Sequence, residues 1–150
     1  CSRARREASG LTVHHRGEDI RGMLRDLKAG GVITLIADQH ARGSELVVPF
    51  FGRPAATVRG PAELAVRLEL PLVPLFFLRQ DGGRHEVRFG DPIDVPRQLA
   101  REDAVLEMTI DYTRALENWI RRHPSQWFWF HDRWKAERHL ARRGAACREN

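Results

Sequence analysis

The chain has little cysteine and no apolar run that is long enough to span a membrane. Its two cysteines, Cys1 and Cys147, stand at no spacing typical of a metal site or a disulfide framework. The longest apolar run, Leu70 to Leu78, has about half the length that a bilayer span needs. No signal peptide, internal repeat or low-complexity tract is visible. These absences favour a reducing compartment and predict that any membrane contact of these residues is peripheral.

Size and charge fit one basic globular domain. The 150 residues are 42% hydrophobic and 30% charged, which is enough for a real core. The 25 Lys and Arg outnumber the 20 Asp and Glu, which favours phosphate-bearing or otherwise anionic partners, although a solvated basic surface gives the same balance. Because the chain begins with Cys1 rather than Met, we expect a fragment. Its predicted parts are a connection over residues 1–17, the C-terminal part of one domain over 18–135, and a basic polar tail over 136–150.

Hydrophobic periodicity predicts helices and strands that alternate. Glu18 to Lys28 has apolar residues at helical spacing and ends at two glycines, and a β-branched apolar strand, Val32 to Ile36, follows directly. Helix, glycine turn and strand in this order are typical of a βαβ unit. Another apolar run covers Leu46 to Phe51. Pro61 to Glu69 is predicted to be a short helix that Pro71 prevents from continuing.

The second half of the chain predicts a buried strand, a hairpin and a long helix. Val73 to Arg79 is almost continuously apolar, so we expect a central strand that is buried on both faces. A turn at residues 81–83 leads into an antiparallel strand, His85 to Phe89. A helix is predicted from about Arg101 to Arg122. The predicted fold class is α/β: a mostly parallel central sheet flanked by helices, with an antiparallel hairpin at one edge and incomplete at the N-terminus.

Two motifs contain candidate catalytic residues. His14 and Asp19 form a His-x4-Asp pattern that can pair a general base with an orienting carboxylate for acyl transfer. Asp19 also lies where a helix N-terminus favours an acid, and this ordinary helix start is the preferred interpretation. Asp38 and Gln39 follow the predicted strand directly, where α/β sheets handle ligands, and Arg42 in the same loop suits a phosphate. An ordinary polar turn explains that loop equally well.

Apolar and basic residues after this loop suggest a lipid or an anion as ligand. Phe50, Phe51, Gly52 and Arg53 suit an acyl chain with an anionic head, or simply end a core strand. Arg59 and Gly60 precede a predicted helix whose free N–H groups can receive an anion, or simply mark its start.

Residues 126–135, QWFWFHDRWK, are the most unusual stretch of the chain. A C-terminal clasp, with alternate aromatic side chains packed on the core, is one interpretation. A membrane-interface patch is another, because Trp beside Arg and Lys suits the headgroup layer. Single-stranded nucleic acid also stacks on aromatic rings near cations. The strand-like period of the aromatic residues favours packing over an open stacking platform.

Four segments, LKAGGVITLIADQ, VPFFGRPAATVRGPAELA, PLVPLFF and YTRALENWIRRHPSQWFWFHDRWK, cover about residues 18 to 135. Together they resemble the bacterial lipid A acyltransferase family of the lauroyl and myristoyl type, within the wider lysophospholipid acyltransferase fold. The resemblance implies transfer of a fatty acyl group from acyl carrier protein to a hydroxyl of a phosphorylated glycolipid. It places the reaction at the cytoplasmic face of the inner membrane and implies no metal or other cofactor.

The resemblance assigns Asp38 and Gln39 to the family's Asp-Gln motif. The family's catalytic His-x4-acid motif and membrane anchor lie well upstream of that motif, and the 23 residues between His14 and Asp38 are too few for the intervening strand and helices. We therefore expect the catalytic histidine to precede residue 1 and the isolated chain to be inactive. Asp132 stands where members often have a second arginine. The residues that match the family's other blocks are Phe50, Phe51, Gly52, Thr57, Gly60, Pro124, Gln126, Trp127, Trp129, His131, Arg133 and Lys135.

A working mechanism and two rivals follow from these assignments. The upstream histidine deprotonates the lipid hydroxyl, Asp38 orients that histidine or the acceptor, and Phe50 and Phe51 shape an acyl groove. The expected partners are acyl carrier protein, an anionic glycolipid and, peripherally, the membrane, with no nucleic acid. The rivals are a phospholipid or phosphoinositide-mannoside acyltransferase and a non-catalytic basic module that binds membrane or nucleic acid. The predicted phosphate contacts are Arg42, Arg53 and Arg59.

Overall fold

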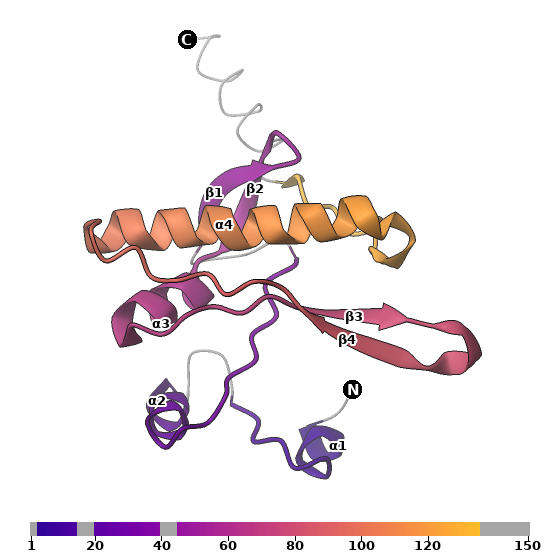
Figure 1. Ribbon diagram of the computed structural model, residues 1–150, viewed down its shortest axis with the longest axis horizontal. Helices are drawn as coiled ribbons and strands as arrows, with labels where there is room; N and C mark the ends of the chain where they lie inside the picture. Colours follow the sequence, from indigo (N-terminus) through magenta and orange to yellow (C-terminus); the bar gives the residue numbers. More distant parts are fainter. Residues whose placement is uncertain (1–2, 15–19, 40–44, 136–150) are drawn as a thin grey trace, which may run out of the picture. The chain divides into compact units, whose positions relative to one another are not determined.

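The computed structural model describes residues 3–14, 20–39 and 45–135, which belong to two compact units, residues 1–35 and 36–150. The first unit contains α1, Arg3–Glu7, and α2, Ile20–Lys28 (Figure 1). α2 confirms the predicted amphipathic helix, and Gly30 follows it with a φ of 85°, which favours glycine. α1 lies in a stretch for which the sequence predicts no element. The second unit contains the four strands of the described residues.

Residues 45–58 form a tight hairpin. β1, Glu45–Phe50, pairs antiparallel with β2, Arg53–Val58. Phe51 and Gly52 form the two-residue turn with φ values of 50° and 74°, and this pair of left-handed conformations is what a type I′ turn requires. The apolar run predicts β1 but not β2, because Pro54 and the two alanines after it are residue types that strands disfavour.

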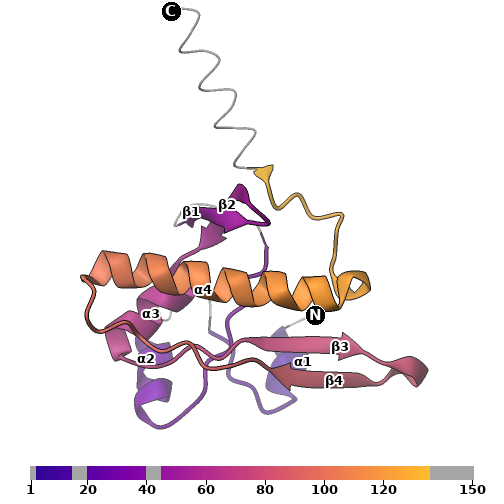
Figure 2. The same ribbon diagram turned by 45° about the horizontal axis from the view of Figure 1, so that its top comes forward.

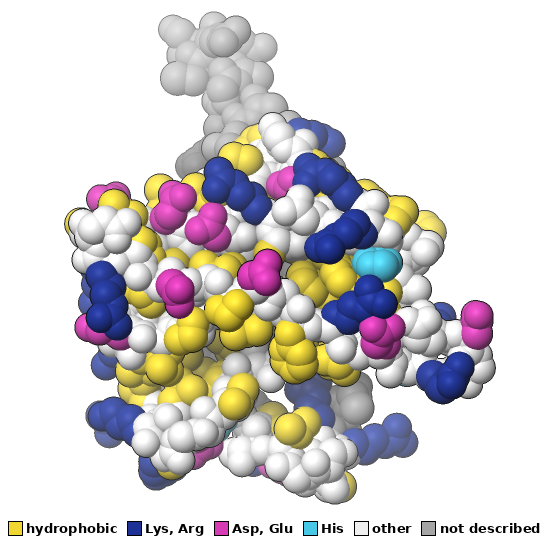
Figure 3. All heavy atoms as spheres, viewed as in Figure 1, with side chains coloured by type: hydrophobic (Ala, Val, Ile, Leu, Met, Phe, Trp, Pro, Cys, Tyr) yellow, Lys and Arg dark blue, Asp and Glu magenta, His cyan; other side chains and the backbone are white. Residues whose placement is uncertain are grey.

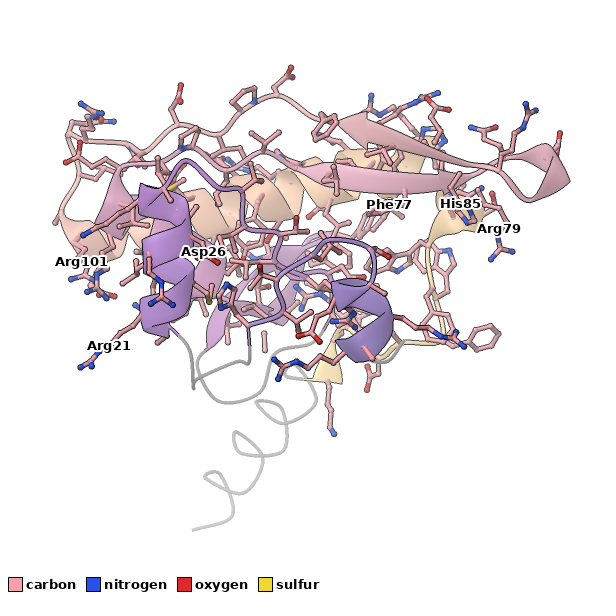
Figure 4. All side chains as sticks on the ribbon, turned by 90° about the horizontal axis from the view of Figure 1, so that it is seen from below. Arg21, Asp26, Phe77, Arg79, His85 and Arg101 are labelled. Atoms are coloured by element: carbon pink, nitrogen blue, oxygen red, sulfur yellow. The ribbon has the colours of Figure 1, made fainter. Side chains whose placement is uncertain are left out.

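A second hairpin follows as the sequence predicts. β3, Leu75–Arg79, pairs antiparallel with β4, His85–Phe89, around the short helix η1, Asp81–Gly83. The prediction that β3 is central and buried on both faces was wrong. Among the described residues β4 is its one ladder partner, and Phe77 on the outer face is exposed. Figure 4 shows Phe77 and Arg79 on the same side of this hairpin as His85.

The predicted strand from Val32 to Ile36 does not form. A strand depends on backbone hydrogen bonds to a neighbour, and no described segment pairs with these residues. Without it, β3 has no parallel neighbour, and both sheets in the described part of the chain are antiparallel pairs. The mixed helix and strand content is confirmed, and the parallel central sheet stays a prediction.

α4, Arg101–Arg122, supports the second unit and confirms the predicted long helix. Val105 and Met108 pack against α3, Gly60–Leu68, which confirms the predicted short helix. Ile120, nearer the C-terminal end, packs against Phe50 of the first hairpin. The chain then passes through η2, Pro124–Gln126, and returns toward β1 and β2 (Figure 2). The buried residues of α4 are Ala104, Val105, Met108, Thr109, Thr113, Glu117, Trp119 and Ile120.

Candidate functional site

A buried arginine lies at the centre of the candidate site. Arg133 keeps only 1% of its surface exposed. Its Nη1 donates a 2.5 Å hydrogen bond to the carbonyl oxygen of Ala56, and its Nη2 donates one of 2.6 Å to Thr57 Oγ1. The guanidinium also lies over the ring of Phe50, 5.1 Å from its centroid. Arg133 and Thr57, both predicted to bind substrate, are therefore bonded to each other inside the protein.

Asp38 belongs to the same cluster. Its Oδ1 atom is buried and has no hydrogen-bond partner in the described residues. Burial lowers the pKa of Arg133, and the charges of Tyr112 and Asp38 oppose that shift, so the Asp38 carboxylate acts electrostatically on the buried guanidinium. Gln39, next in the chain, is exposed, and the predicted phosphate contact Arg42 lies outside the described residues.

Tyr112 reaches this cluster from α4. Its hydroxyl donates a hydrogen bond to the carbonyl oxygen of Val58, at the end of β2. Burial raises the pKa of Tyr112 to about 12, against smaller lowering effects of Thr109 and of the Arg133 charge. The phenol is therefore neutral at physiological pH. The sequence places Tyr112 on the apolar face of a helix, and its polar end on that face is the signal that could have identified it.

Of the residues predicted to shape an acyl groove, one lies in the core and the other at the surface. Phe50 is fully buried between the aromatic rings of Trp127 and Trp134, with ring centroids 6.1 Å and 5.5 Å away. Phe51, in the turn, is partly exposed and meets Phe50 edge to face at 4.8 Å. Arg53 is exposed, with its guanidinium 4.8 Å from the ring centroid of Trp134. A ligand can therefore meet Phe51 and Arg53 directly, whereas Phe50 supports them from the core.

Glu117 fixes the turn that presents these two residues. It is buried on α4, and its Oε1 accepts a 2.9 Å hydrogen bond from the backbone N–H of Phe51. Its Oε2 accepts one of 2.8 Å from Arg121, whose guanidinium lies 4.9 Å from the ring centroid of Phe51. Sequence reasoning missed Glu117, although an acid on the buried face of an amphipathic helix is a usable signal.

The predicted anion site before α3 holds a cation that is already paired. Arg59 forms ion pairs with Glu63, at 2.9 Å, and with Glu102, at 2.8 Å. The hydrogen bond to Glu102 is the main reason that the pKa of Arg59 is raised. The helix begins at Gly60, one residue before the predicted start at Pro61. A phosphate at this end of α3 would compete with two carboxylates for Arg59.

His14 belongs to the first unit and is paired there. Its Nε2 lies 2.9 Å from Oδ2 of Asp26, which projects from α2 (Figure 4). Asp19, the acid that the sequence pattern assigns to His14, lies outside the described residues. The structure thus gives His14 a carboxylate partner within its own unit.

The aromatic stretch after α4 combines packed and exposed side chains. Trp134 donates a 3.0 Å hydrogen bond from Nε1 to the carbonyl oxygen of Phe50, and Trp127 packs on the same core cluster. Residues 128–130 are exposed, and His131 is partly buried. The clasp interpretation holds for Trp127 and Trp134. The predicted strand-like period was wrong, because residues 127–134 form turns and bends after η2.

This arrangement offers a carboxylate beside a buried cation, with apolar and basic groups on a nearby turn. Within the described ranges no three His, Cys, Asp or Glu side chains are placed to hold a metal ion. No described helix has both the length and the apolar character needed to cross a membrane. The family model described as bacterial lipid A biosynthesis acyltransferase matches residues 2–136. No curated protein matches the chain.

Proposed function

The chain belongs to the bacterial lipid A biosynthesis acyltransferase family, and from this premise we propose that it transfers a fatty acyl group from acyl carrier protein to a phosphorylated glycolipid. The acceptor hydroxyl attacks the thioester carbonyl, a C–O bond forms, the C–S bond breaks, and the proton passes through a histidine to the leaving thiolate. That histidine is expected to precede residue 1, because the spacing between His14 and Asp38 is too short for the family pattern.

The observation that carries this proposal is the environment of the Asp38 carboxylate. Its Oδ1 atom is buried without a hydrogen-bond partner among the described residues, and the Asp38 side chain acts electrostatically on the buried guanidinium of Arg133. A carboxylate in this state can accept a hydrogen bond from the catalytic histidine or from the acceptor hydroxyl. Arg53, exposed at the start of β2 next to the turn, is proposed to contact a phosphate of the glycolipid.

Location follows from the two substrates. Acyl carrier protein is a cytoplasmic donor and the acceptor is a membrane lipid, so the reaction is proposed for the cytoplasmic face of the inner membrane. The basic composition suits an anionic acceptor. Phosphorylated glycolipid is preferred over phospholipid or phosphoinositide mannoside, because the family match covers the closing block that is typical of lipid A enzymes.

Substitution of Asp38 in the full-length protein tests the proposal. Asp38→Asn keeps the shape of the side chain and removes its charge, so turnover with acyl carrier protein and glycolipid should fall by about 10²-fold or more. The free energy of unfolding should change much less. Asp91→Asn, on an exposed acid, is the matched control. Unchanged turnover in Asp38→Asn would remove Asp38 from the mechanism. If the protein acylated a phospholipid in preference to the glycolipid, the proposed acceptor would be wrong.

A further inference from the structure

We propose that Phe128, Trp129 and Phe130, named here the aromatic loop, insert into the headgroup layer of an anionic lipid bilayer. This inference rests on the proposed function in one respect, namely that the acyl acceptor is a membrane lipid. It adds the surface by which the enzyme meets that membrane. Three consecutive aromatic side chains are exposed here, with exposed fractions of 64%, 52% and 93%.

The aromatic loop is held in its exposed form by its own hydrogen bonds. Trp129 donates a 2.7 Å hydrogen bond from Nε1 to the carbonyl oxygen of Pro124, and the N–H of His131 donates to the carbonyl oxygen of Phe128 at 3.2 Å. The side chain of Gln126 bonds both the N–H and the carbonyl oxygen of Arg79, each at 3.2 Å. Because the loop is already ordered, insertion costs little conformational entropy.

Arginine residues lie on the segments next to the aromatic loop. Arg121 and Arg122 form the last turn of α4, and Arg79, which Gln126 binds, is exposed at the end of β3. Lys and Arg side chains gather over this end of α4 (Figure 3). Three acids also lie on neighbouring segments: Glu117 is paired with Arg121, Glu86 of β4 is paired with Arg88, and Asp132 follows the loop in the chain. Exposed Trp and Phe beside cations match the requirements of an interface with anionic headgroups.

The ring geometry favours lipid over nucleic acid. The rings of Phe128 and Phe130 contact each other at 5.9 Å with an interplanar angle of 51°. Bases of a single strand stack on ring faces that are open and successive. Two tilted rings in mutual contact offer a compact apolar wedge instead, and such a wedge suits the boundary between headgroups and acyl chains.

Quenching of Trp129 by brominated lipids tests the docking. The full-length protein is reconstituted into phosphatidylcholine and phosphatidylglycerol vesicles with or without brominated acyl chains, and the Trp129 signal is the difference between the parent and Trp129→Phe. Bromine should remove most of that signal. The double substitution Phe128→Ser, Phe130→Ser should restore it. Phe89→Ser is the matched control, because Phe89 is 71% exposed at the end of β4 far from Arg79 in the ladder register, and it should change nothing.

Substitution of the neighbouring arginines tests whether the membrane must be anionic. For the detergent-solubilised protein, each of Arg121→Gln and Arg122→Gln should weaken partitioning into anionic vesicles by about fivefold. Trp129 emission that brominated lipid leaves intact, whether or not aqueous acrylamide quenches it, would overturn the proposal. So would stronger quenching by a single-stranded oligonucleotide than by vesicles. The readout needs no acyl donor, so docking without acyl transfer would refute the proposed function alone.

Discussion

Nη2 of Arg133 lies 2.6 Å from Oγ1 of Thr57, and this hydrogen bond joins residues that are 76 positions apart in the sequence. Together with the bond to the carbonyl oxygen of Ala56, it ties the segment after α4 to the end of β2. Both partners are buried, so the bonds are shielded from water and from salt. Two motif blocks that are distant in sequence thus form one structural unit beside Asp38.

Arg133→Met should destabilise the second unit strongly. The substitution keeps apolar volume but removes the Arg133 donor from the Ala56 carbonyl, at about 1–3 kcal/mol for a buried acceptor. It also removes the bond to the Thr57 hydroxyl, which keeps its own hydrogen bond to the Ala55 carbonyl. Urea unfolding measures the loss. Arg133→Met should also lower acyl-transfer activity, because it removes the charge near Asp38. Compared with Arg133→Met, Arg133→Lys should regain part of the activity but less of the stability, because lysine keeps the charge but cannot form both hydrogen bonds in the geometry of the guanidinium. Arg114→Met, on an exposed arginine of α4, is the control, and equal stability of both Met variants would contradict this role.

Local elements were predictable, whereas the contacts that make the site were not. The apolar period of α4 and the glycine turn before β4 lie within short windows, and both predictions are confirmed. The contact between Arg133 and Thr57 depends on how distant segments pack, and no spacing within either block reveals it. The failed strand prediction at Val32 to Ile36 has the same cause. Its residue types favour a strand, but a strand also needs a neighbour, which local sequence does not specify.

Glu117→Ala should loosen the turn at Phe51 and Gly52. The substitution removes the acceptor of the Phe51 N–H and the partner of Arg121, so a loss of about 1–3 kcal/mol in the free energy of unfolding is expected. Amide hydrogen exchange should increase at Phe51 more than along α4. Glu107→Ala, on the exposed face of the same helix, is the matched control. Unchanged exchange at Phe51 in Glu117→Ala would show that the turn holds without this contact.

Titration of Tyr112 provides a direct test of the buried cluster, because it is the single tyrosine of the chain. In the unfolded chain its phenol ionises near the ordinary pKa of 10.0, whereas in the folded protein burial raises the pKa to about 12. Between these pH values the folded state retains a proton that the unfolded state has lost. Stability from this group is therefore complete below pH 10 and declines as the pH rises toward 12, by about 2–3 kcal/mol in all.

Two measurements follow this transition. Near-ultraviolet absorbance of the phenolate gives the pKa in the folded protein, while circular dichroism shows that the fold persists. Urea unfolding on either side of pH 10 gives the loss of stability. In Tyr112→Phe that part of the alkaline loss should vanish, although the variant also loses the hydrogen bond to Val58 at every pH. Phenolate that forms near pH 10 while the fold is intact would mean that water reaches the hydroxyl, and Tyr112 would then not belong to a closed cluster with Arg133.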